Sequence, residues 1–134
     1  MMRKILLLCL PLVLLIACAP AVPSDELILI GRLTHINETL YCGIIHTGSI
    51  AEYSDLQVLD GSYFKKTIYV VQGCPELKRS EYSKNGGDLE SFRVGDYHLL
   101  YLTKQNIYRI EGFINDTRKG FPLYFCQRVD LYSK

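Results

Sequence analysis

The sequence predicts a mainly β fold: a small closed or partly open five- to six-stranded barrel, with one short helix after the third strand. Two observations predict it. Segments rich in β-branched and aromatic residues recur along the chain, separated by turn signals such as Asp60-Gly61. One proline-initiated segment interrupts this series directly after the clearest strand. Closure of the sheet removes exposed strand edges, which suits a small domain.

The first half of the expected barrel consists of β-rich segments. Residues 27–35 alternate loosely between apolar and polar side chains, and residues 39–45 resume this character after a turn. Residues 49–59 form a weaker continuation that closes at an Asp-Gly turn. Residues 66–72 are the richest in β-branched and aromatic side chains, which is typical of a buried strand. We expect these segments to supply the first three strands.

The second half begins with a helix signal. Pro75 suits a first helical position and Glu76 favours the positive end of a helix dipole, so residues 75–82 are expected to form a short helix. Asn85-Gly86-Gly87 would end it. The remaining expected strands are residues 97–103, 107–114 and 121–132.

The amino-terminal end of the chain has the layout of an export signal. Arg3 and Lys4 precede 13 uncharged, apolar residues that end at Ala17. A helix of that length reaches only about 20 Å, whereas the hydrocarbon core of a bilayer is roughly 30 Å thick. Residues 1–17 therefore predict a cleaved signal peptide and not a membrane-spanning helix.

The apolar run ends in Leu15-Ile16-Ala17-Cys18, which resembles the lipobox of bacterial lipoproteins. The resemblance implies cleavage before Cys18 and lipid on its thiol, so that the acyl chains make the contact with the membrane. In enteric lipoproteins an Asp after the lipidated Cys signals retention in the inner membrane, so Ala19 at this position implies the outer membrane. The resemblance does not indicate which face of that membrane the protein occupies. The alternative is an ordinary cleaved signal in which Cys18 is a coincidence.

The rest of the chain divides into a tether and one domain. Residues 18–26 are expected to be an extended tether, because Pro20 and Pro23 stand in a stretch of small residues. Residues 27–134 form the single barrel domain. Loss of the signal lowers the 15 basic side chains to 13, against 14 acidic ones. This balance, without a block of like charge, argues against nucleic acid as a partner.

The order of the expected elements resembles that of oligonucleotide/oligosaccharide-binding (OB) barrels. The pieces Leu59-Asp60-Gly61, Val71-Gln72-Gly73-Cys74, Gly95-Asp96-Tyr97-His98-Leu99-Leu100 and Tyr124-Phe125-Cys126 further resemble netrin-like modules, which include the amino-terminal domain of tissue inhibitors of metalloproteases. The resemblance implies an OB/netrin-like barrel. As an alternative function it implies inhibition of an extracellular hydrolase.

Three cysteines remain once Cys9 leaves with the signal and Cys18 carries lipid, namely Cys42, Cys74 and Cys126. An oxidising compartment predicts one disulfide and one free thiol among them. Spacing alone leaves all three pairings open. The netrin-like resemblance implies the pair Cys74–Cys126 and leaves Cys42 as the free thiol, with Cys42–Cys126 as the alternative.

The sequence contains no arrangement that predicts catalysis, and we expect no cofactor. Cys42 and His46 would share one strand face, but four strand residues span about 13 Å, which is too far for one zinc ion without a sharp bend. His98 falls on the face of Leu100 and Leu102, where a hydrogen-bonded structural role is expected.

We therefore expect a non-enzymatic, lipid-anchored cell-envelope protein that presents its barrel to a protein, peptide or glycan partner. The alternatives are the netrin-like inhibitor and a metal- or thiol-handling envelope protein that uses Cys42, His46 or His98. The 10 tyrosines of the chain fit either a binding face or half-buried strand positions.

Overall fold

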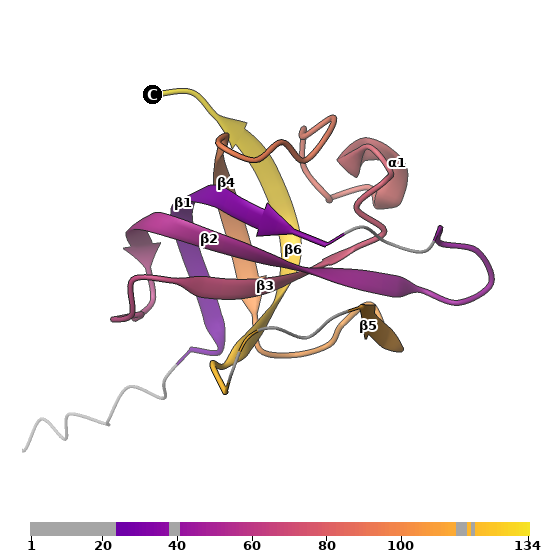
Figure 1. Ribbon diagram of the computed structural model, residues 1–134, viewed down its shortest axis with the longest axis horizontal. Coiled ribbons are helices and arrows are strands. Elements are labelled where there is room, and N and C mark those ends of the chain that lie inside the picture. Colours follow the sequence, from indigo (N-terminus) through magenta and orange to yellow (C-terminus); the bar gives the residue numbers. More distant parts are fainter. Residues whose placement is uncertain (1–23, 38–40, 115–117, 119) are drawn as a thin grey trace, which may run out of the picture.

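The fold is seen in a computed structural model that describes residues 24–37, 41–114, 118 and 120–134 (Figure 1). The expected signal peptide, Cys18 and most of the expected tether lie outside these residues. Within the described ranges, no helix has both the length and the apolar character needed to span a bilayer.

Six strands and one short helix make up the described chain, and all of them lie after Ser24. The elements are β1 (Glu26–Ile36), β2 (Thr47–Asp60), β3 (Ile68–Gly73), α1 (Arg79–Tyr82), β4 (Tyr97–Thr103), β5 (Gly112–Ile114) and β6 (Leu123–Tyr132). The prediction of a mainly β chain with one short helix after the third strand is confirmed. A protein that starts at Ser24 therefore contains every strand and helix that the structure describes.

Five of the strands close into a barrel. Their order is β1-β4-β6-β3-β2, and a further pairing of β1 with β2 completes the ring. β3 and β6 run parallel, whereas the other neighbouring pairs of the ring are antiparallel. β5 adds a short parallel strand beside the start of β2, where Gly112 pairs with Thr47. The predicted small, closed five- to six-stranded β-barrel is confirmed.

Each strand of the ring contributes side chains to one apolar core. Leu29, Tyr53, Ile68, Leu100 and Val129, one from each strand, are all at most 1% exposed. Full burial of a side chain of this size stabilises the fold by roughly 1.5–3 kcal/mol. Along β4, buried positions alternate with partly buried ones over most of the strand, as expected for a sheet with one face toward the core.

The expected strand at residues 107–114 is shorter in the structure than its sequence pattern indicates. Residues 107–114 were expected to be extended, but β5 covers Gly112–Ile114 only. The amide of Asn106 donates to the carbonyl of Ile110 and its carbonyl oxygen accepts the N–H of Ile110, both at 2.9 Å. These bonds close a turn and remove the backbone of Ile110 from strand pairing.

Two further predictions, a strand at residues 39–45 and a helix at residues 75–82, differ from the structure. The described part of the expected strand 39–45 lies in the loop before β2, because Cys42 is bonded to a residue beyond the end of β3. The expected helix 75–82 is reduced to Arg79–Tyr82. A turn, in which the N–H of Leu77 donates to the carbonyl of Cys74 at 3.0 Å, takes the place of its first half.

The two ends of the barrel carry different parts of the chain. At one end, which we call the tether end, β1 begins at Glu26 opposite Thr103, and β2 ends at Asp60 opposite Ile28. At the other, the loop end, the β1–β2 loop (residues 37–46, described at 37 and 41–46) lies beside the end of β3. Figure 1 shows this loop and the start of β1 on opposite sides of the molecule.

Candidate functional site

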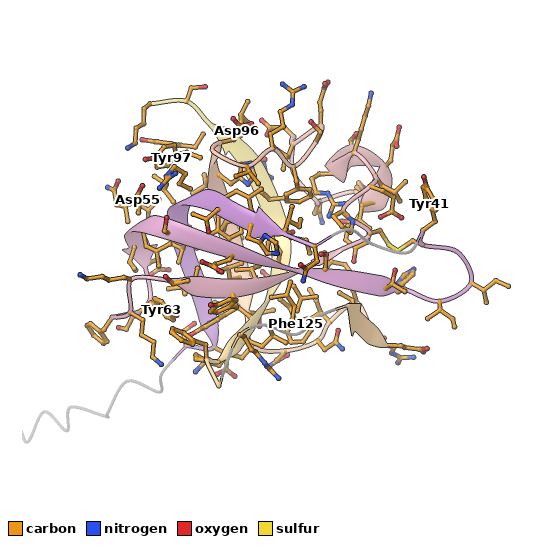
Figure 2. The ribbon with its side chains drawn as sticks, in the orientation of Figure 1. Tyr41, Asp55, Tyr63, Asp96, Tyr97 and Phe125 are labelled. Carbon is orange, nitrogen blue, oxygen red and sulfur yellow. A yellow bond between two sulfur atoms is a disulfide. The ribbon has the colours of Figure 1, made fainter. Side chains whose placement is uncertain are left out.

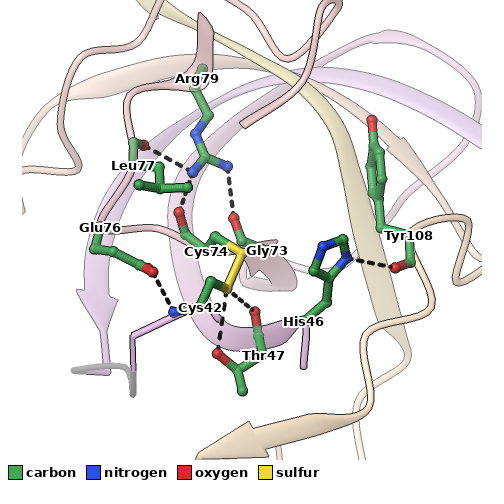
Figure 3. Close-up of a disulfide and its surroundings, with 9 residues drawn as sticks. All are labelled: Cys42, His46, Thr47, Gly73, Cys74, Glu76, Leu77, Arg79 and Tyr108. Atoms are coloured by element: carbon green, nitrogen blue, oxygen red, sulfur yellow. Dashed lines mark hydrogen bonds between the residues drawn. A yellow bond between two sulfur atoms is a disulfide. The ribbon is translucent and has the colours of Figure 1, made fainter. Parts of the chain in front are cut away.

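A disulfide between Cys42 and Cys74 joins the β1–β2 loop to the residue that follows β3 (Figure 3). The two Cα atoms lie 5.5 Å apart, and 32 positions separate the cysteines in sequence. The N–H of Cys74 donates to the carbonyl of Thr47 at 3.1 Å. Both the middle of the loop and its return into β2 are therefore tied to the end of β3.

The predicted pairing of Cys74 with Cys126 is wrong, and Cys42 is not the free thiol. Cys126 is the free cysteine among the described residues, and it is buried in β6 opposite Leu102. Cys74 lies beyond the end of β3, at the rim of the barrel and out of register with that position. Burial raises the pKa of the Cys126 thiol to about 12, which argues against thiol chemistry there.

Arg79 is a buried cation that holds the segment after β3. Its side chain reaches back from α1, and the residue is 2% exposed. One terminal nitrogen donates to the carbonyl of Gly73 at 2.9 Å, and the other donates to the carbonyls of Cys74 and Leu77 at 2.5 and 3.0 Å (Figure 3). Burial lowers the pKa of the guanidinium from its ordinary value, although an arginine stays charged. Arg79 thus fixes the backbone on both sides of Cys74.

Sequence reasoning missed Arg79, because a basic residue between Lys78 and Ser80 in a short helix is ordinarily solvated. The rings of Tyr82 and Phe92 cover its guanidinium, with centroids 4.6 and 5.2 Å from the guanidinium carbon. The only sequence signal of this arrangement is the spacing of three positions between Arg79 and Tyr82, which places both on one helix face.

The polar groups around the disulfide are bonded to the protein itself. Glu76 accepts the backbone N–H of Cys42 at 2.7 Å, and its carboxylate lies within 4.8 Å of both sulfurs. Thiolates, and not disulfide sulfurs, bind metal ions, so the oxidised trio offers one carboxylate only. His46, predicted as a candidate ligand with Cys42, lies with its Nδ1 3.3 Å from the carbonyl of Tyr108 (Figure 3).

The outer part of the β1–β2 loop exposes three large apolar side chains. Tyr41 is 89% exposed, Ile44 105% and Ile45 55%. We call these three residues the loop tip. The three lie within five positions of one loop, and exposed apolar side chains that gather on a surface are typical of contact sites. Figure 2 shows Tyr41 at the loop end, across the molecule from Tyr63 at the tether end.

The other tyrosines mostly pack against neighbouring rings. Edge-on or tilted ring pairs with centroids 5.1–5.8 Å apart join Tyr63 to Tyr124, Tyr69 to Phe121 and Tyr82 to Tyr108. Half-buried strand and loop positions therefore account for these tyrosines, and Tyr41 stands apart from them at the loop tip.

His98 has the hydrogen-bonded structural position that the sequence predicts. It is 0% exposed, and its Nδ1 lies 3.0 Å from the hydroxyl of Tyr53, to which the amide of Gln72 donates at 3.4 Å. Its Nε2 has no hydrogen-bond partner among the described residues. Burial lowers the pKa of His98 to about 4 because the core solvates the imidazolium poorly. The ring is therefore neutral at pH 7.

Acid is expected to destabilise the fold through His98. Below pH 6.5 the unfolded chain takes up a proton on this histidine, whereas the folded chain does so only near pH 4. The free energy of unfolding therefore falls with pH through this window, by about 2–3 kcal/mol between pH 7 and 4.5. Urea unfolding at both pH values measures the fall. We expect His98→Gln to remove most of it and His35→Gln, at an exposed position, to retain it; equal falls in both variants would contradict the assignment.

Comparison of the chain with protein-family models, with curated proteins and with solved structures finds no match. The described residues bring together, at the loop end, a disulfide, a buried arginine and an exposed apolar tip. This arrangement is suited to contact with another macromolecule.

Proposed function

We propose that this chain is a lipid-anchored cell-envelope protein, held through lipid on Cys18 in the outer membrane, and that its barrel is a binding module for a protein partner. The lipobox-like Leu15-Ile16-Ala17-Cys18 supports the anchor. The binding role is supported by the location of the loop tip, because a barrel anchored at the tether end presents its loop end away from the membrane. The observation that carries the proposal is an exposed apolar tip on a disulfide-fixed loop.

The loop tip has the composition and the rigidity of an energetic hot spot. Tyrosine is enriched at such sites, and full burial of an isoleucine contributes roughly 1.5–3 kcal/mol. The disulfide and the bond from the N–H of Cys42 to Glu76 hold the loop before a partner arrives, which lowers the ordering cost of binding. An apolar groove on a folded protein or peptide fits this tip better than a glycan, whose hydroxyls require polar partners.

Replacing Ile44 by Asp is expected to weaken partner binding about 30-fold, because a hot-spot side chain contributes about 2 kcal/mol or more. The measurement is the native mass of the endogenous protein extracted in mild detergent, followed by titration of the partner so identified. We expect wild-type protein to carry both the lipid on Cys18 and the partner, and Ile44→Asp to keep the lipid and lose the partner.

The matched control is Val94→Asp, which places the same charge at another exposed apolar position, 63% exposed, in the segment before β4. This variant is expected to keep the partner. A complex that survives Ile44→Asp would contradict the role of the loop tip. A mature mass without lipid on Cys18 would contradict the anchor alone.

A second candidate function, inhibition of an extracellular hydrolase, is favoured by the same protruding loop, since a rigid loop also fits an enzyme cleft. The protein that starts at Ser24 would then inhibit hydrolases of its own compartment. Absence of inhibition at micromolar concentration would exclude this alternative for the enzymes tested.

A further inference from the structure

The turn between β2 and β3, residues 61–67, exposes an aromatic ring and two basic side chains next to one another. Phe64 is 95% exposed, and Lys65 and Lys66 are exposed beside it. An aromatic ring with adjacent ammonium groups is a combination typical of membrane–water interfaces. There the ring enters the headgroup layer and the cations meet lipid phosphates.

The turn keeps its shape without using Phe64. The hydroxyl of Tyr63 donates to the carbonyl of Thr67 at 2.6 Å, and its ring meets that of Tyr124 edge on, with centroids 5.8 Å apart. Tyr63 therefore ties the turn to β6. Phe64 is the aromatic residue of the turn that points to solvent, and the contacts that hold the turn do not use it.

This turn lies at the tether end, beside the point where the chain enters β1. A Cβ atom on Gly61 would lie 2.8 Å from the carbonyl oxygen of Glu26, so the two backbones are in close contact. Residues 24–27, 61 and 62 line one pocket of about 160 Å³ together with Lys104 and Tyr124. Figure 2 shows Tyr63 on this side of the barrel.

The charges of the turn itself are all positive. Residues 61–67 contain two lysines and no acid. Asp25, Glu26 and Asp60 lie at this end, and Asp60 accepts the N–H of Gly61 at 3.0 Å. Asp55 lines a pocket together with Lys65 and Lys66, and the Nζ of Lys65 lies 4.3 Å from the centroid of the Phe121 ring. The turn itself is therefore basic, and the acids at this end lie outside it in sequence.

The length of the tether brings this end close to the bilayer. Six peptide units separate Cys18 from Ser24, and a chain of that length spans at most about 22 Å. We propose that the turn 61–67 is a membrane-contact surface: Phe64 inserts at headgroup level, and Lys65 and Lys66 bind the phosphates of anionic lipids. The inference rests on the proposed lipid anchor for the nearness of the membrane, and on the turn for the contact.

A single tryptophan reports the contact directly, because the chain contains none. Phe64→Trp and, as the matched control, Ile44→Trp at the loop tip are reconstituted as lipidated protein that begins at Cys18, in phosphatidylglycerol vesicles with brominated acyl chains. We expect Trp emission to shift to the blue and to be quenched at position 64, and to be unchanged at position 44. Equal emission at the two positions would overturn the proposal.

A second measurement does not depend on the anchor. The protein that starts at Ser24 is mixed with phosphatidylglycerol vesicles, and its partition is measured by sedimentation. Replacing Lys65 and Lys66 together by Gln is expected to lower partition roughly 25-fold, since each lysine near an anionic surface contributes about a factor of five. Lys78→Gln with Lys84→Gln, the same charge change at the loop end, is expected to leave partition unchanged.

Failure of the proposed membrane-contact surface can be distinguished from failure of the proposed lipid anchor. Suppose that only the Lys65/Lys66 variant loses partition and that Cys18 proves to carry no lipid. This result would support the membrane-contact surface and reject the lipid anchor. Equal partition of both double variants would reject the surface whatever the state of Cys18. Partition that is insensitive to phosphatidylglycerol content would also reject it, and would leave a protein partner as the occupant of the turn.

Discussion

Replacing Arg79 by alanine is expected to lower the free energy of unfolding by about 3 kcal/mol, with a fall in Tm of about 12 °C. The guanidinium supplies donors to three carbonyls around the disulfide, and a bond from a charged group stabilises a fold by about 1.5–3 kcal/mol. Relief of the desolvation of a buried cation offsets part of this sum. Urea unfolding followed by circular dichroism and a thermal scan measure both quantities, at about 4 °C per kcal/mol for a domain of this size.

Two further variants separate the stabilising effect of the several N–H donors of Arg79 from the effect of its positive charge. Arg79→Lys keeps the charge, but its compact ammonium cannot serve three separated carbonyls as a planar guanidinium does, so only part of the stability is expected to return. Arg32→Ala removes a surface arginine paired with Asp55 at 2.7 Å, and it should leave the midpoint nearly unchanged. An unfolding midpoint of Arg79→Ala equal to that of Arg32→Ala would show that the carbonyls find other donors.

The barrel could be predicted from the sequence because several of its strands have the composition that is typical of buried strands. Residues 66–72 and 97–103 are rich in β-branched, aromatic or other large apolar side chains, and they form β3 and β4 nearly as expected. The expected strand 107–114 failed for a local reason. The side chain of Asn106 bonds both backbone groups of Ile110, and composition does not show which backbone groups a side chain will take.

The loop tip could not be predicted, because an apolar contact surface and an apolar core have the same composition. Tyr41, Ile44 and Ile45 stand in a run that is typical of a strand, yet all three are exposed. The physical cause is a bond distant in sequence: Cys42 is held at the end of β3 by Cys74. A resemblance in strand order also could not identify the cysteine pair, since the pairing depends on how far beyond its strand each cysteine lies.

Removing the disulfide by Cys42→Ser with Cys74→Ser is expected to lower the free energy of unfolding by about 4 kcal/mol. The bond closes a loop across 32 positions, and the chain-entropy model assigns a stabilisation of this size to such a loop. Urea unfolding with and without a reductant measures it. The wild type and the Cys126→Ser variant should lose stability on reduction, whereas the double variant should not respond.

Cys126→Ser is the matched control because a serine hydroxyl can donate to the carbonyl of Arg128, as the Cys126 thiol does at 3.2 Å. Its free energy of unfolding in the absence of reductant should stay within about 1 kcal/mol of that of the wild type. A response to reductant in the double variant would place the bond elsewhere.

The same double variant links stability to the proposed function. The disulfide holds the base of the loop that carries Tyr41, Ile44 and Ile45. Without it the loop has to become ordered when the partner binds, and the entropy lost in that ordering weakens binding. At a temperature where the double variant is still folded, we therefore expect its affinity for the partner to fall about tenfold with Ile44 intact. A folded double variant with wild-type affinity would mean that the partner orders the loop by itself, and that the disulfide serves the barrel alone.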